Sequence, residues 1–274
     1  MARLSEKDRQ LELARQNRLL ARADRRFGRE FEIVLSSGSE QMLDQYKRTG
    51  SAPDLPIDFY RRVEAVYVDL AGVVTEAFGA RVLDQGKTLG YDFEVKNVFE
   101  NFAAFFQQMA LDYIAQEAIR QRIASVTNTT RDIIVNLITQ GQKAGDSVDD
   151  IADRIASRIP VISRWRGAMI ARTETHGAAN YGAQQAGKAT GLPLKKEWIS
   201  AEDHRTRDFG QGDGVVDEFD HRSANGQIVD LDQPFRIASR NGAFEEIMFP
   251  GDPSGSAGNV INCRCASARF VEGF

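Results

Sequence analysis

The chain has 274 residues, of which 42% are hydrophobic and 27% charged, and its formal net charge is −4 at pH 7. This balance is ordinary for a folded chain and excludes collagen, low-complexity disorder and a disulfide scaffold. No stretch approaches the roughly 18 consecutive apolar residues of a membrane-spanning helix, and the polar first residues do not read as a secretory signal, so we expect no membrane contact. The two cysteines, Cys263 and Cys265, are one residue apart, which favours synthesis in a reducing cytoplasm.

Charge is distributed unevenly along the chain. Residues 1–30 carry nine Lys or Arg against five Asp or Glu, whereas residues 196–260 carry six against thirteen. So acidic a C-terminal part argues against a protein that grips nucleic acid along its whole length. The basic N-terminal segment is either a solvated helix face or a nonspecific contact for DNA or an acidic partner. The arginines expected to make that contact are Arg15, Arg18, Arg22, Arg25 and Arg26.

Up to about residue 190 the hydrophobic periodicity is helical. In the first helix Leu13, Leu20 and Phe27 recur every seven residues and form a narrow apolar seam, which suits packing on another helix or on a partner chain. A connector is expected next, marked by Gly38, Gly50, Pro53 and Pro56.

Further helices are predicted at about 57–83, across an aromatic segment from Phe99 to Tyr113, and at 131–142. Ser147 and Asp150 then have the spacing of a capping box, which predicts the start of another helix. Pro160 is expected to end that helix and to open a long one, which closes at about residue 189 before Gly191.

After residue 191 the pattern changes to short strand-like runs between turn-rich loops, at 196–200, 227–231, 234–237, 244–249 and 260–270. This order predicts an α+β fold: a mostly helical N-terminal half is followed by a small C-terminal domain in which a long helix packs on a short-stranded antiparallel sheet. We divide the chain into an N-terminal amphipathic helix and connector (1–52), a helical domain (53–145) and an α+β domain (146–274).

Polar residues recur on the long helix. Arg172, His176 and Asn180 are four residues apart and share one face, whereas Glu174 lies on a different side. Buried polar groups must find partners, so we interpret the set as a structural polar network. The alternative is a catalytic Arg/Glu/His set, which lacks a nucleophile with an obvious activating base.

Alternating charges occupy the loop 203–208 (DHRTRD). The first interpretation is a structural latch, in which arginines pair with carboxylates such as Asp203. The second is an anion or phosphate site formed by Arg205, Arg207 and Arg222 with two histidines. The acidic residues at 213–220 do not match the spacing of a calcium loop.

The Cys263-Arg264-Cys265 run lies in the last predicted strand, where alternate side chains point to the same side. The two thiols are therefore either packed as small core side chains or, with His221 and His204, ligands of a tetrahedral zinc site. No other cofactor is expected.

These residues run in an order that resembles a known family. The ordered motifs are Ala171–Glu174, Asn180, Lys196–Trp198, Asp203 with Arg205 and Arg207, His221, Asn225–Gln227, Pro234-Phe235, Pro250–Asp252 and Asn262–Cys265. The set resembles the phage Mu F-like family of head morphogenesis, or minor head, proteins, over about residues 130–268.

The resemblance implies a virion component and structural protein that lies at the portal vertex or capsid interior. It implies a role in viral capsid assembly and in genome packaging or delivery, with the portal protein and/or the major capsid protein as partners. The residues of the family motif, expected to form its polar network, are Arg172, Glu174, Asn180, Trp198, Asp203, Arg205 and Arg207.

An enzyme delivered with the genome is the alternative to a structural protein. It would be a small nuclease or transferase that uses His204 and His221 as acid and base and Arg205 and Arg207 to stabilise phosphate. The sequence contains no Walker motif and no Gly-rich dinucleotide fingerprint, which argues against a motor or a dehydrogenase.

Overall fold

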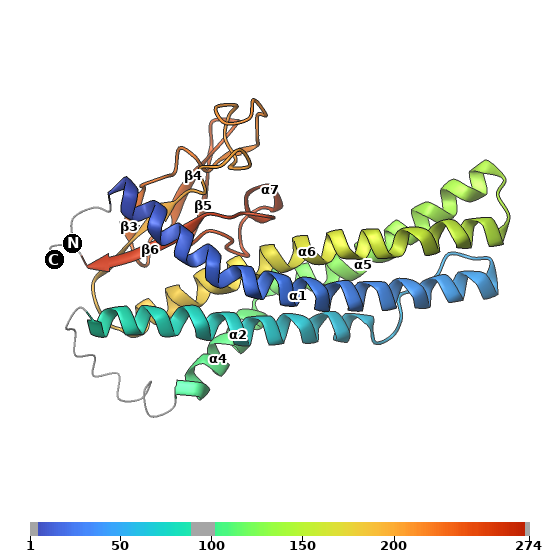
Figure 1. Ribbon diagram of the computed structural model, residues 1–274, viewed down its shortest axis with the longest axis horizontal. Helices are drawn as coiled ribbons and strands as arrows, with labels where there is room; N and C mark the ends of the chain where they lie inside the picture. The colour runs from blue at the N-terminus through green and yellow to red at the C-terminus, as the bar shows by residue number, and fades with distance from the viewer. Residues whose placement is uncertain (1–4, 89–101, 272–274) are drawn as a thin grey trace. The chain divides into compact units, whose positions relative to one another are not determined.

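The computed structural model describes residues 5–88 and 102–271 (Figure 1). The helices are α1 (Glu6–Thr49), α2 (Phe59–Thr88), α4 (Phe102–Ala115), α5 (Glu117–Ala144), α6 (Val148–Ala189) and the short α7 (Ala257–Val260). The strands are β1 (Leu194–Ile199), β2 (Phe219–Asp220), β3 (Ile228–Asp230), β4 (Phe235–Ser239), β5 (Phe244–Ile247) and β6 (Ala266–Val271). Long helices thus precede short strands, which confirms the predicted α+β class; Phe99, at the start of the predicted aromatic helix, lies outside the described residues.

Helix α1 is longer than expected because Gly38 does not interrupt it. The helix ends at Thr49, and Gly50, which follows it, adopts a left-handed φ of 65°, so only the later part of the predicted connector is correct. A Cβ atom placed on Gly38 would lie 2.5 Å from the ring of Phe59. The glycine therefore allows close packing of α1 against the start of α2.

The seven-residue seam of α1 is buried inside the chain itself. Leu13, Leu20 and Phe27 are at most 5% exposed, and Leu13 packs against Ile199 and Ala266. Leu13 thus packs on strands β1 and β6 of the same chain, whereas the seam was expected to pack on another helix or on a partner chain.

Helix α6 begins with the predicted capping box. The Asp150 N–H donates to Ser147 Oγ (3.2 Å), and the Ser147 N–H donates to Asp150 Oδ2 (3.3 Å). Pro160, however, does not end the helix, which continues to Ala189. Proline removes one backbone hydrogen bond, to the carbonyl four residues earlier. Both Pro160 and Ala156 are exposed, so water can satisfy that carbonyl.

The strands form two three-stranded antiparallel sheets, in the orders β3-β1-β6 and β2-β4-β5. Strand β2 was not predicted because its two residues are too few for an alternating pattern. The run predicted at 260–270 is a strand only from Ala266; Ala257–Val260 is helical and a turn follows it.

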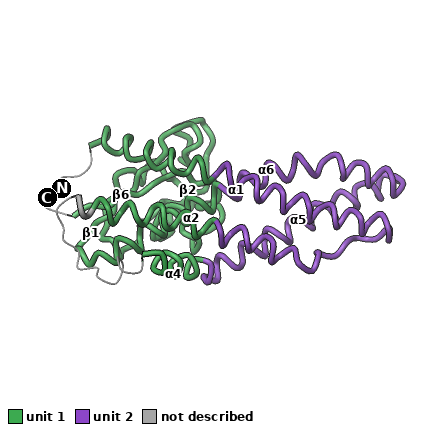
Figure 2. Tube along the Cα trace, turned by 60° about the horizontal axis from the view of Figure 1, so that its bottom comes forward, with its two compact units in different colours: residues 1–23, 70–113, 172–274 green, residues 24–69, 114–171 purple. Residues whose placement is uncertain are grey.

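The chain divides into two compact units (Figure 2). Unit 1 consists of residues 1–23, 70–113 and 172–274 and contains both sheets, and unit 2 consists of residues 24–69 and 114–171 and is helical. Helices α1, α2 and α6 contribute residues to both units. The units group segments that are distant in the sequence, so the contiguous division at residues 52 and 145 stays a prediction.

Candidate metal centre

Three potential metal ligands meet inside unit 1. His221 directly follows β2, whereas Cys263 and Cys265 precede β6. The Sγ atoms of both cysteines lie 3.6 Å from His221 Nδ1, and all three ligand atoms are within 4.8 Å of one another. The three residues are at most 3% exposed. The arrangement therefore offers two sulfurs and one imidazole nitrogen to a single buried point.

The two cysteines lie between the turn at residues 261–262 and β6 and not, as predicted, on a strand. The Cys263 N–H donates to Val260 O (3.1 Å), and Asn262 has a left-handed φ of 63°. Helix α6 holds this turn: the Asn262 N–H donates to Thr173 Oγ1 (2.9 Å), and Arg172 Nη1 donates to Asn262 Oδ1 (2.9 Å). The predicted proximity of the two sulfurs is thus present, although the segment that carries them is not a strand.

A chain of hydrogen bonds fixes the imidazole ring of His221. Its Nε2 lies 2.5 Å from Asn259 Oδ1, and Asn259 Nδ2 donates to Glu245 Oε2 (2.8 Å). Because the amide nitrogen is engaged by the carboxylate, the amide oxygen must accept, which assigns the histidine proton to Nε2. The Nδ1 lone pair then faces the sulfurs. Sequence reasoning missed Asn259 and Glu245, since no spacing rule connects them to the cysteines.

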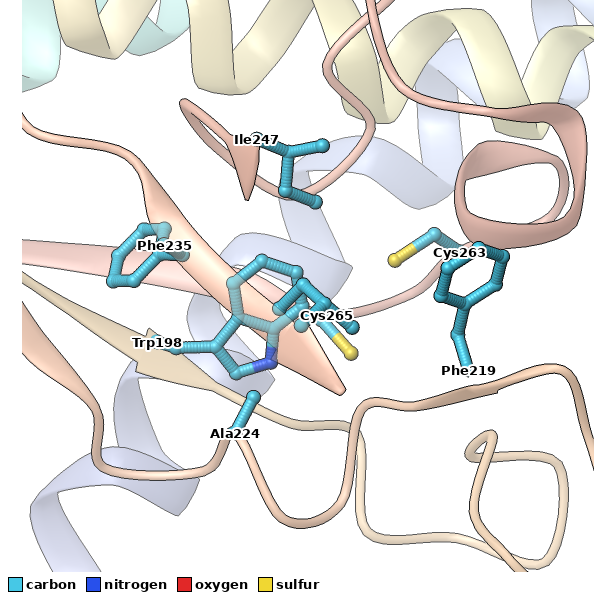
Figure 3. Packing of buried hydrophobic residues seen from close by; sticks show 8 residues of the cluster. Trp198, Phe219, Ala224, Phe235, Ile247, Cys263 and Cys265 are labelled. Carbon is cyan, nitrogen blue, oxygen red and sulfur yellow. The ribbon is translucent and has the colours of Figure 1, made fainter. Parts of the chain in front are cut away.

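The surroundings of the cysteines are apolar. Both belong to a hydrophobic cluster with Trp198, Phe219, Ala224, Phe235, Ile237 and Ile247. Figure 3 shows the two cysteine side chains within this cluster, with their sulfur atoms between the rings of Trp198 and Phe219 in that view. The ring of Trp198 also meets that of His221 edge to face, with centroids 5.4 Å apart. Apolar side chains thus make up much of the surroundings of the two sulfurs.

The two thiols have opposite tendencies to ionise. A hydrogen bond from the Cys265 thiol lowers the pKa of Cys263 well below its ordinary value. Burial raises the pKa of Cys265 well above its ordinary value.

His204 is not part of this group. Its side chain is exposed in the loop after β1, and among the described residues the ligand atoms that cluster are those of His221, Cys263 and Cys265. The structure thus brings together three of the four residues considered for zinc.

An arginine from outside the charged loop 203–208, Arg264, forms an ion pair with Asp203 of that loop. Arg264 clasps the Asp203 carboxylate with both terminal nitrogens (2.5 and 2.6 Å), while Arg205 is exposed and 3.7 Å from it. Arg207 donates to the carbonyl of Ile261, and Arg222 donates to Asp208 Oδ2 (2.8 Å). The three arginines considered for an anion site, Arg205, Arg207 and Arg222, thus have separate partners, which is the geometry of a latch and does not converge on one anion.

The polar residues of α6 contact the sheet region. Asn180 Nδ2 donates to Pro250 O (3.0 Å), and Ser267 Oγ donates to Asn180 Oδ1 (3.1 Å). Glu174 and Trp198 are buried, and Arg172 is half-buried on the turn described above. The contribution of this network to stability stays a prediction.

The arginines of the basic N-terminal segment lie on exposed positions of α1. They are Arg15, Arg18, Arg22, Arg25 and Arg26. Arg26 is already engaged by Glu30 and Asp69. No helix within 5–88 or 102–271 is long and apolar enough to cross a membrane.

The fold and the site together define an α+β protein in which long helices support two small sheets around a buried cysteine–histidine cluster. Residues 132–268, half of the chain, match the family described as "Phage Mu protein F like protein", and the chain belongs to this family of phage head-related proteins. It is also 25% identical, over 143 residues, to the "Uncharacterized protein YqbB" of Bacillus subtilis (strain 168). That match covers 52% of this chain and 43% of the relative, so the chain spans less than half of the relative's length. No solved structure matches the chain.

Proposed function

We propose that this protein is a minor head protein: a structural virion component, bound near the portal or the inner capsid, that acts in head assembly and in genome packaging or delivery. The family match over residues 132–268 carries this proposal, because it includes the cysteine–histidine cluster, the Asp203 latch and the polar residues of α6. The partners we propose are the portal protein and/or the major capsid protein.

Leu13, Leu20 and Phe27 of the apolar seam of α1 are buried within the chain, so we do not propose the seam as the contact surface for such partners. The exposed arginines at positions 15, 18, 22 and 25 of α1 supply an alternative surface. We propose that they contact packaged DNA or an acidic face of a head protein, because unscreened positive charge attracts both.

Quantitative mass spectrometry of purified particles tests the proposal, with the major capsid protein as the internal standard. We expect a few to a few dozen copies per particle and cross-links to the portal or capsid protein. Absence from particles would overturn the virion role, and presence without any cross-link to those two proteins would overturn the proposed partners.

The alternative of an enzyme delivered with the genome gains no support from the arrangement of its residues. His221 is buried and bonded to Asn259, whereas His204 is exposed, and Arg205 and Arg207 have separate partners. Nuclease activity of the purified protein, compared with a His204→Ala/His221→Ala variant, remains its test.

A further inference from the structure

We propose that His221, Cys263 and Cys265 bind one zinc ion, with water as the fourth ligand, and that the ion joins the two sheets of unit 1. The proposal does not depend on a role in the phage head, because it concerns the purified chain alone. It follows from the ligand geometry, from the groups that orient the ligands and from the elements that the ligands connect.

The distances between the ligand atoms suit zinc. Bonds of about 2.3 Å to sulfur and about 2.0–2.1 Å to nitrogen, at the tetrahedral angle, place a sulfur and a nitrogen ligand about 3.6 Å apart. Both Sγ–Nδ1 distances are 3.6 Å. Two soft thiolates and one imidazole favour the borderline-soft zinc ion over the hard ions magnesium and calcium.

The imidazole ring of His221 is held in the orientation of a metal ligand. A metal-binding histidine uses one nitrogen for the ion and donates the other N–H to an acceptor that fixes the ring. Here Nε2 donates to Asn259, and Glu245 holds the Asn259 amide in the orientation that accepts. Glu245 is itself fixed by the backbone N–H of Ser256 (2.6 Å). This relay leaves Nδ1 available toward the sulfurs.

The apolar cluster around the sulfurs also favours an ion. Two buried thiolates without a counter-charge would repel each other, whereas the charge of Zn²⁺ neutralises both. The backbone N–H of Ala201 already donates to Cys265, as is suitable for a thiolate. Among the described residues, the fully buried Nε1 of Trp198 has no hydrogen-bond partner, and Figure 3 shows this nitrogen on the side of the ring that faces the Cys265 sulfur.

The fourth ligand comes from solvent. Within the part of the chain that the structure describes, no other His, Cys, Asp or Glu joins the three ligands. A zinc ion with three protein ligands completes its tetrahedron with water. The Trp198 N–H is a donor that such a water, or a metal-bound sulfur, is able to use.

The ligands belong to different sheets. His221 directly follows β2, in the β2-β4-β5 sheet, while Cys263 and Cys265 lead into β6, in the β3-β1-β6 sheet. One ion therefore cross-links two small sheets that each have only three strands. Loss of the ion is expected to lower the stability of unit 1.

Elemental analysis of the full chain, purified without a histidine tag, is the first test. We expect about one zinc per chain, and loss of that zinc in Cys263→Ser and in His221→Ala. His204→Ala is the matched control, because this histidine is exposed and outside the cluster, and it should retain the metal. A folded chain that contains no zinc and whose melting temperature does not rise when zinc is added would overturn the proposal. Zinc retained in both ligand variants would do the same.

Refolding with Co²⁺ keeps the proposal testable where a ligand variant fails to fold. The wild-type chain should show the visible bands of tetrahedral cobalt and a thiolate-to-cobalt charge-transfer band, which Cys265→Ser should roughly halve. Asn259→Ala retains all three ligands but loses the acceptor for His221, so zinc affinity, measured by competition with a chelator, should fall about 10–100-fold. An octahedral cobalt spectrum without charge transfer, or an unchanged affinity in Asn259→Ala, would contradict the ligand set or its orientation.

Discussion

Lys196 is a charged residue placed where a charge is unfavourable. It lies in β1 with no exposed surface, and its Nζ donates to Met248 O (2.7 Å) and lies 5.2 Å from the centroid of the Phe235 ring. Burial, together with the nearby charges of Arg269 and Lys188, lowers the pKa of Lys196 from 10.5 to about 7. The residue is therefore partly neutral in the folded protein near pH 7.

This shift makes stability depend on pH in a defined direction. Between pH 7 and 10.5 the unfolded chain holds the Lys196 proton and the folded chain does not, so the free energy of unfolding rises with pH. The rise approaches about 1.4 kcal/mol per pH unit for one proton. We expect denaturant unfolding from about pH 7 to pH 9 to show this increase for the wild type relative to Lys196→Met. A difference between the two proteins that is constant across this range would contradict the shifted pKa.

Asp203 provides a second test at the residue scale. It accepts both terminal nitrogens of Arg264 and also the backbone N–H of Arg205 (3.0 Å). Asp203→Ala removes the bidentate ion pair and leaves the Arg264 guanidinium without its carboxylate partner. We therefore expect the free energy of unfolding to fall by about 1–3 kcal/mol. Arg205→Ala is the control: the Arg205 side chain is exposed and makes only a 3.7 Å surface ion pair with the carboxylate, so its loss should change stability by less than about 0.5 kcal/mol. Equal effects of the two substitutions would show that Arg264 contributes nothing specific.

At the scale of the elements, glycines set how closely the helices pack. A Cβ on Gly182 of α6 would lie 2.7 Å from the backbone of Thr75 in α2, whereas a Cβ on Gly72 of α2 would meet nothing within 4 Å. Gly182→Ala should therefore destabilise the protein by about 1–3 kcal/mol, because backbone atoms must move. Gly72→Ala should stabilise it by about 0.5–1 kcal/mol through helix propensity alone. Thermal unfolding of the pair distinguishes close packing from propensity, and stabilisation by both substitutions would contradict the close approach of α6 to α2.

The same scale shows which elements are predictable from sequence. The seam of Leu13 and Leu20 and the capping box at Ser147 depend on neighbouring residues of one helix, and both are present in the structure. The breaks expected at Gly38 and Pro160 are wrong, because Phe59 packs against the first and solvent can satisfy the carbonyl freed by the second. Local signals thus fail where a distant side chain or water compensates for them.

The candidate site was predictable only in part, for a related reason. The cysteines and His221 are recognisable by residue type, but their convergence depends on the turn at Asn262, which α6 holds through Thr173. Asn259 reaches His221 from α7, and Arg264 reaches Asp203 across 61 positions of the chain. Pairings of this kind are made by the tertiary fold, and no spacing in the sequence encodes them.

For the whole molecule, the uneven charge predicts how the chain meets DNA. Arg15, Arg18 and Arg22 lie exposed on α1. If they bind phosphates, the affinity for duplex DNA should fall steeply with salt, and their joint replacement by glutamine should make the dependence of log affinity on log salt shallower by about 0.9 for each phosphate interaction removed. Fluorescence anisotropy measures both effects. The control is glutamine at the exposed Arg205, Arg236 and Arg240 of the acidic segment; an equal effect there, or salt-insensitive binding, would contradict DNA binding through α1.

Because unit 1 combines segments that are distant in the sequence, we expect truncation of the N-terminal segments to destabilise it. Leu13 packs on Ile199 and Ala266, and Gln16 Nε2 donates to Ser267 O (3.2 Å). A fragment of residues 132–274 lacks both interactions and the parts of α2 and α4 that belong to the unit. We expect such a fragment to unfold without a cooperative transition in circular dichroism, while the full chain shows one. A cooperative fragment would contradict this dependence.

Unit 1 is built from segments that are distant in the sequence, and this affects how the gene can be exchanged between genomes by recombination. The family match begins at residue 132, inside α5, yet the unit that contains the cysteine–histidine cluster also includes residues 1–23 and 70–113. A phage genome that acquired only the matched segment by recombination would obtain the cluster without the helices that pack around it. Exchange between genomes should therefore preserve the whole gene, or select for a new N-terminal half whose residues fit the same strands.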